Sequence, residues 1–164
     1  TFASLTLVDI TPHMEPAGVA KVMGFMSDKL EEGFATVEEA ADVIASYMPH
    51  RPRPADLSGL AKNLRQCADG RYRWHWDPRF VTSVMQTRDR HSMEDMQARL
   101  GELRLPIHLI RGRMSELVTE ENAKLFLKST PNASYTDIAG AGHMVAGDRN
   151  DAFVDAVVAF LSAQ

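Results

Sequence analysis

The chain alternates short, apolar, β-prone runs with longer segments of helical period, and this alternation constrains the fold more than any other feature. The apolar runs occupy residues 4–10, 106–112 and 134–138. The first two lack the regular polar alternation of a strand with one face in water, which is typical of strands buried on both faces of a parallel sheet, and residues 134–138 are expected to form a third strand. Parallel strands joined by helices define the α/β class, so we predict an α/β fold.

Helix signals fill the intervals between these runs. Proline suits the first position of a helix, and a threonine followed three residues later by glutamate has the form of a capping box. The helix after Asp56 is expected to carry its apolar stripe as far as Leu64. The expected helix starts lie at or just after Pro16, Thr36, Asp56, Ser92, Thr119 and Asp148.

Composition and charge exclude several classes of protein. The 164 residues are 45% hydrophobic and 24% charged, with a formal net charge of −4. This balance is typical of a globular domain and unlike a disordered tail or a strongly basic nucleic-acid binder. No apolar stretch reaches the length of a membrane span, and no signal peptide is recognisable. The lone Cys67 cannot form an internal disulfide and indicates a reducing compartment, so we expect a cytoplasmic protein.

Two loops that follow predicted strands carry titratable groups. Residues 112–118 contain Glu116, and residues 140–144 contain His143. Reactive groups of open parallel sheets lie in loops beyond the carboxyl ends of the strands. A carboxylate bonded to one imidazole nitrogen fixes the tautomer and leaves the other nitrogen as a general base. We therefore expect the carboxylate of the first loop to meet the histidine of the second.

These two loops carry a resemblance to a known family. Arg111-Gly-Arg-Met-Ser-Glu-Leu-Val118, followed by Gly140-Ala-Gly-His-Met144, resembles the closing third of an α/β-hydrolase. The resemblance implies that Glu116 is the acid of a catalytic triad and His143 its base, in the chain order of that fold. Asp9, at the end of the first apolar run, is the rival acid. The alternatives are a helix-capping role for Glu116, a loop-anchoring role for Asp9 and a structural loop histidine.

The resemblance also implies a domain organisation. Residues 1–13 would form a core strand, residues 14–103 a mainly helical cap with the return to the core, and residues 104–164 the C-terminal core. No Gly-x-Ser-x-Gly nucleophile motif is present. The chain is therefore expected to be the C-terminal half of an enzyme, inactive without its N-terminal half. If it stands alone, the free edge of the first strand needs a partner or a second copy, which would make a homodimer.

The function implied is that of a serine-type hydrolase acting on a small ester or acyl substrate, without a cofactor. Two alternatives stay open: a non-catalytic binding module that reuses the fold, and a cofactor-free perhydrolase or peroxidase that passes the acyl group to peroxide with the same triad. The hydrolase would take up its substrate beside Trp74, Trp76 and Met144. The competing interpretation is that the tryptophans only hold the cap to the core and that methionine fills space.

Other site types are not expected. The histidines show no ligand-type pairs at spacings of three to five residues, and no phosphate-binding Gly-rich loop is present. The alternating arginines and aromatic residues at 71–76 resemble a nucleic-acid contact only weakly in a chain of negative charge. We therefore predict no metal, no nucleic acid and no membrane as partners. The six histidines are His13, His50, His75, His91, His108 and His143.

Overall fold

The computed structural model describes residues 2–87 and 90–164, which divide into two compact units. The sheet unit consists of Thr1–Lys21 with Arg88–Gln164, and the hairpin unit consists of Val22–Thr87. The first boundary between the units, after Lys21, falls within α1. The elements are β1 (Leu5–Val8), α1 (Pro16–Ser27), α2 (Val37–Tyr47), α3 (Ser58–Ala61), β2 (Leu64–Gln66), β3 (Tyr72–Trp74), α4 (Pro78–Thr87), α5 (Arg90–Glu102), β4 (Ile107–Gly112), α6 (Glu120–Ser129), β5 (Ala133–Ile138), α7 (Val145–Asp148) and α8 (Asn150–Ser162).

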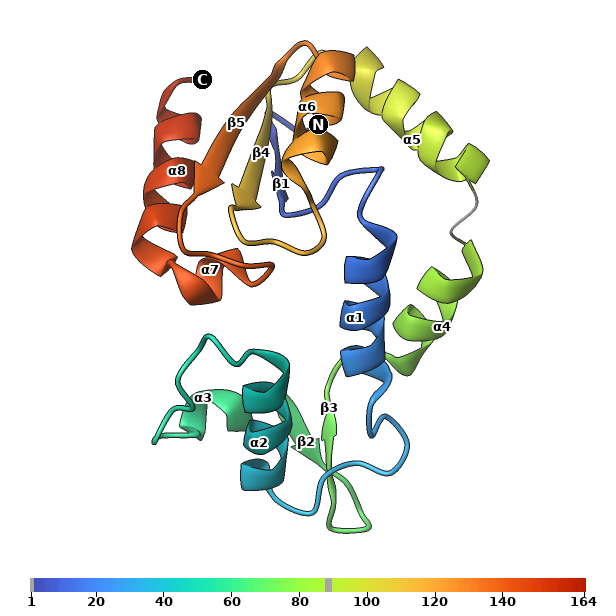
Figure 1. Cartoon of the computed structure of the whole chain (residues 1–164), viewed down its shortest axis with the longest axis vertical. Coiled ribbons are helices and arrows are strands. Elements are labelled where there is room, and N and C mark those ends of the chain that lie inside the picture. The colour runs from blue at the N-terminus through green and yellow to red at the C-terminus, as the bar shows by residue number, and fades with distance from the viewer. Residues whose placement is uncertain (1, 88–89) are drawn as a thin grey trace. The chain divides into compact units, whose positions relative to one another are not determined.

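The sheet unit is built on three parallel strands in the order β1-β4-β5 (Figure 1). Leu7 of β1 lies opposite Leu109 of β4, and Leu109 lies opposite Tyr135 of β5. Each strand follows its predecessor in the sheet after a helical connection, as parallel pairing requires. The predicted α/β class is confirmed.

Burial separates the central strand from its two neighbours. All six residues of β4 are buried, as the apolar run predicted. The same expectation was wrong for β1, whose residues are half-buried and whose Val8 is exposed. Among the described residues β1 pairs only with β4, so one of its edges has no strand beside it. The sequence pattern indicates that a strand is apolar, whereas its burial depends on how many strands and helices pack against it.

Helices α6 and α8 cover the sheet (Figure 1). Helix α8 packs through Phe153 and Val157 on a cluster that includes Ile110 of β4 and Ile138 of β5. Helix α6 begins at the predicted cap, where Thr119 and Asn122 bond reciprocally through side chain and backbone. These contacts hold the carboxyl ends of β4 and β5 against α8 and fix the start of α6.

Two of the predicted helix signals, at Thr36 and after Asp56, had different outcomes. Helix α2 begins after Thr36, whose hydroxyl accepts the Glu39 amide N–H at 3.1 Å. The helix expected to reach Leu64 ends at Ala61 instead. Leu64 pairs with Trp74 across the β2–β3 hairpin, and both side chains are buried in the same cluster. Strand pairing and burial therefore override the helical period here.

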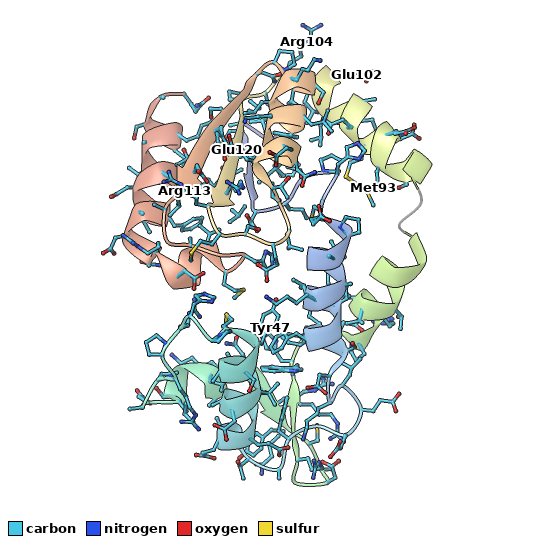
Figure 2. The ribbon with its side chains drawn as sticks, in the orientation of Figure 1. Tyr47, Met93, Glu102, Arg104, Arg113 and Glu120 are labelled. Carbon is cyan, nitrogen blue, oxygen red and sulfur yellow. The ribbon has the colours of Figure 1, made fainter. Side chains whose placement is uncertain are left out.

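The hairpin unit has its own aromatic core. Trp74 is buried and packs edge-on against Phe34, with ring centroids 5.1 Å apart. Trp76 stacks on Trp74 at 4.6 Å, and Tyr47, labelled in Figure 2, stacks on Phe25 at 4.2 Å. The rings of β3 and the segment after it therefore pack in one cluster.

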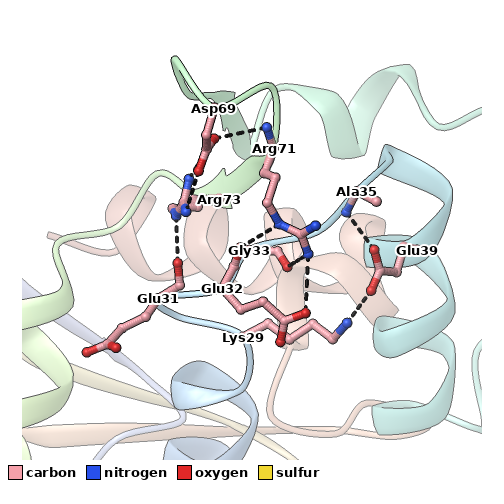
Figure 3. A network of polar contacts seen from close by, with 9 residues as sticks. All are labelled: Lys29, Glu31, Glu32, Gly33, Ala35, Glu39, Asp69, Arg71 and Arg73. Carbon is pink, nitrogen blue, oxygen red and sulfur yellow. Dashed lines mark hydrogen bonds and ion pairs between the residues drawn. The ribbon is translucent and has the colours of Figure 1, made fainter.

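Charged groups fasten this hairpin to the preceding loop (Figure 3). Arg71 donates to the Glu32 carbonyl at 2.7 Å, and Arg73 donates to the Glu31 carbonyl at 2.9 Å. Arg73 also holds both oxygens of Asp69, and with the Arg71 backbone amide it lowers the pKa of Asp69 to about 2. This network gives the arginines at alternate positions a role in holding the hairpin to the loop.

The predicted cap, residues 14–103, covers a longer stretch of sequence than the hairpin unit, Val22–Thr87. It includes α5, which belongs to the sheet unit, and positions 88 and 89, which lie outside the described residues. A covering role for this region stays a prediction. No helix in the described part of the chain has the length and apolar character to cross a membrane. The cytoplasmic location also stays a prediction.

We predict that mild acid destabilises the fold through His108. Its side chain is 2% exposed, its Nε2 lies 2.9 Å from Thr136 Oγ1, and burial lowers its pKa from the ordinary 6.5. Below pH 6.5 the unfolded chain takes up a proton that folded His108 resists. The stability is therefore full above that pH and is lost as the pH falls toward the lower, folded-state pKa.

Urea unfolding at pH 7.5 and pH 5.5 measures this effect. We expect a drop in unfolding free energy of no more than about 1.4 kcal/mol, since pH 5.5 lies one unit below the ordinary histidine pKa of 6.5. The drop should shrink in His108→Gln and persist in His75→Gln, whose histidine is exposed. An equal drop in His108→Gln would assign the acid sensitivity to other groups.

Candidate active site

The site begins at Asp9, directly after β1. Because β1 and β4 are parallel, with Val8 opposite Ile110, the next residue of β1 comes beside the end of β4. Asp9 has a φ of 51°, in the left-handed region that Asp tolerates better than most residues, and its side chain is fully buried. Its Oδ1 accepts the Gly112 amide N–H at 3.2 Å. A buried carboxylate needs such donors, because otherwise its desolvation is costly.

His143 reaches the same carboxylate from the loop after β5. Its Nδ1 lies 3.0 Å from Asp9 Oδ2, and its side chain is 29% exposed. The loop is held by Asp148, whose Oδ2 accepts the Gly142 amide N–H at 2.9 Å. Asp148 was expected to start the last helix, but it bonds to this loop and α8 begins at Asn150. Asp148 therefore holds the histidine loop and does not start the last helix.

Arg111 clamps the loop that follows β4. Its buried guanidinium donates from Nε to the Val118 carbonyl at 2.6 Å and from Nη2 to the Arg113 carbonyl at 3.2 Å. Asp137 of β5 accepts from Arg111 Nη1 and from Nε of Arg113, which Figure 2 labels, both at 3.0 Å. Residues 113–118 are thus held at both ends by one cation that is itself paired.

Glu116 does not occupy the expected position. Its Oε1 pairs with Lys21 Nζ of α1 at 3.1 Å, while Asp9 takes the Nδ1 of His143. Burial raises the pKa of Glu116, but hydrogen bonds from its own backbone amide and from Lys21, with a smaller charge effect of His143, lower it overall. The expected meeting of Glu116 with His143 is therefore corrected to a meeting of Asp9 with His143.

Close packing against α1 explains the direction of Glu116. A Cβ at Gly18 would lie 1.8 Å from the Glu116 carbonyl oxygen, so only glycine permits this approach. The Glu15 amide N–H donates to the Leu117 carbonyl at 2.8 Å in the same place. With its backbone held against α1, Glu116 points its side chain toward Lys21.

The predicted substrate-binding residues fall in different units. Met144, beside His143 in the sheet unit, is 48% exposed. Trp74 and Trp76 belong to the hairpin unit, where Trp74 is a core residue, which supports the packing interpretation for that ring. Both indole N–H groups are buried without a hydrogen-bond partner among the described residues. A substrate-binding role for these residues stays a prediction.

Among the described side chains, which do not include that of His91, no group of three histidines, cysteines or acids could hold a metal ion. The groups that meet at the site are a carboxylate and an imidazole. A carboxylate on Nδ1 orients the ring and stabilises its protonated form, while Nε2 can take a proton from a nucleophile. The sequence feature that could have identified Asp9 is an acid directly after a predicted strand. Its loop lies at the same edge of the sheet as the loops of Glu116 and His143.

Comparisons with known proteins give structural neighbours only. No family model matches the chain, and no curated protein sequence matches it. Among solved structures, E-2-(acetamidomethylene)succinate hydrolase is similar with a TM-score of 0.78 and 18% identity. An esterase from Mycobacterium tuberculosis has a TM-score of 0.71 and 21% identity. A thioesterase domain from the curacin biosynthetic pathway has a TM-score of 0.63 and 19% identity.

These matches cover 98% of this chain in each case, but only 57%, 54% and 58% of the three neighbours. The chain therefore spans between half and three fifths of the length of these structures. Other neighbours, which include an α/β-hydrolase from Novosphingobium aromaticivorans, are covered to a similar extent. The fold of the chain is that of part of an α/β-hydrolase, as the resemblance implied.

We predict that Gly18→Ala disrupts the loop of Glu116, whereas Gly24→Ala in the same helix does not. Both changes favour helix by up to about 1 kcal/mol. A Cβ at position 24 meets no atom within 4 Å, but at position 18 it collides with the backbone of Glu116. We expect Gly18→Ala to lose about 3 kcal/mol of unfolding free energy in urea titrations. Equal stability of the two variants would contradict the close approach.

Proposed function

We propose that the sheet unit supplies the base and the acid of a serine-type ester or acyl hydrolase, with His143 as the base and Asp9 as the acid. The observation that carries the proposal is the 3.0 Å contact between His143 Nδ1 and Asp9 Oδ2. The acid is fully buried and the imidazole is partly exposed. This is the arrangement in which the second ring nitrogen can serve a reacting group.

In the proposed reaction, a serine outside these 164 residues attacks the acyl carbonyl. His143 Nε2 takes the hydroxyl proton as the new bond forms, and gives it to the leaving group as the old acyl bond breaks. The same nitrogen then activates water to release the acid product. Asp9 orients the ring and stabilises the imidazolium without taking the proton itself.

Two further observations support this assignment. Solved structures that are similar to this chain include a hydrolase, an esterase and a thioesterase domain. The chain spans little more than half of them, and its own sequence has no Gly-x-Ser-x-Gly motif. We therefore propose that the nucleophile and the oxyanion donors come from protein outside this chain. The proposed substrate is a small ester or acyl compound, with exposed Met144 as an apolar contact beside His143.

We predict that Asp9→Asn and His143→Ala each lower kcat for a chromogenic ester by about 10³- to 10⁴-fold in the complete protein. Glu116→Gln is the matched carboxylate control, and its effect should stay within a few-fold because Glu116 pairs with Lys21. Circular dichroism and urea unfolding of each variant would separate loss of chemistry from loss of fold.

Three results would contradict the proposal. Retained turnover in His143→Ala would remove the histidine from the reaction. A large loss in Glu116→Gln with a small loss in Asp9→Asn would return the role of acid to Glu116. The absence of turnover, and of labelling by a serine-directed phosphonate, in the unmutated complete protein would favour the non-catalytic binding module.

A further inference from the structure

The hydroxyl of Ser115 makes three hydrogen bonds in the sheet unit. Together they determine which partner receives its single proton. Its Oγ lies 2.5 Å from Asp9 Oδ2. The same oxygen accepts the backbone N–H groups of Leu117 at 3.0 Å and Val118 at 3.2 Å. A serine hydroxyl has one proton to donate and two lone pairs to accept with. Both lone pairs are in use, so the contact with Asp9 must be a donation from Ser115.

This donation and one from the backbone give each oxygen of Asp9 a donor. Asp9 Oδ2 accepts from Ser115, and Oδ1 accepts from the Gly112 amide N–H. A protonated Asp9 that donated toward Ser115 would need a third acceptor site on the hydroxyl, which does not exist. Asp9 therefore does not donate to Ser115, and an ionised carboxylate, which only accepts, satisfies the contacts at both oxygens. Its contact with His143 at Oδ2 then requires the imidazole to donate from Nδ1.

We propose that Ser115 is a positioning residue that fixes the tautomer of His143 through Asp9. With the proton held on Nδ1, the neutral ring presents an unprotonated Nε2, which is the form that a general base needs. Ser115 does not touch the nucleophile or the substrate in this role. Its own direction comes from the loop 113–118, which the buried Arg111 holds at Val118 and Arg113.

Nitrogen-15 NMR of the histidine rings tests the tautomer without any need for turnover. In the complete protein at neutral pH, His143, assigned by the signals lost in His143→Gln, should show a protonated Nδ1 and a bare Nε2. We expect Ser115→Ala to give a mixture of both tautomers. Ser115→Thr keeps the hydroxyl and should keep the single tautomer, while Ser115→Cys, a weak donor, should behave like the alanine variant.

Ester turnover gives the second readout, which rests on the proposed function. Ser115→Ala should lower kcat by about 10- to 100-fold, as loss of a hydrogen bond to a charged group does. KM should change by less than about threefold, and Ser115→Thr should restore most of kcat. A fold defect would instead lower the urea midpoint of Ser115→Ala and would not be corrected selectively by threonine.

The tautomer and the ester turnover together distinguish failure of the positioning role from failure of the proposed function. A single Nδ1–H tautomer in Ser115→Ala and Ser115→Cys, with the wild-type kcat, would overturn the positioning role. A tautomer change in those variants of a protein that does not hydrolyse esters would uphold the positioning role and remove only the proposed function. If Ser115→Ala does not fold, the comparison of Ser115→Cys with Ser115→Thr decides the inference in the same way.

Discussion

The buried carboxylate of Asp9 is the interaction on which the arrangement of the site depends. It joins three segments that are far apart in the sequence, because it accepts from Gly112 at the end of β4 and from Ser115 beyond it, and contacts His143 after β5. A carboxylate without solvent needs such donors to remain charged. The two loops therefore supply the hydrogen bonds that the buried carboxylate of Asp9 needs. The carboxylate in turn holds the loops in one arrangement.

Close backbone packing brings those segments within reach of each other. A Cβ at Gly112 would lie 2.1 Å from the Gly142 carbonyl oxygen, so the end of β4 can approach the histidine loop only as glycine. The Met114 amide N–H also donates to the Ala141 carbonyl at 2.8 Å. These contacts follow from the pairing of β4 with β5, which places the two loops side by side at one edge of the sheet.

The residue at the motif position of the acid is not the residue that contacts the histidine. Glu116 stands at that position, but Asp9 makes the contact. Glu116 occupies the position that the resemblance assigns to the acid, but its backbone is packed against Gly18 and its side chain pairs with Lys21. The residue before it, Ser115, contacts the acid instead. The loop thus keeps a part in the site through its serine, although its carboxylate does not contact the histidine.

The sequence by itself determined the three strands of the sheet unit, their α/β class, most helix starts and the loop that carries His143, because apolar period, capping residues and glycines act over a few neighbouring residues. Only the tertiary structure decided which acid meets the histidine, since three loops on one edge offered two carboxylates and the spacing along the chain does not rank them. It also decided that Leu64 is a strand residue and that β1 is half-buried. Pairing, burial and close approach depend on residues distant in sequence, and a local pattern carries no record of them.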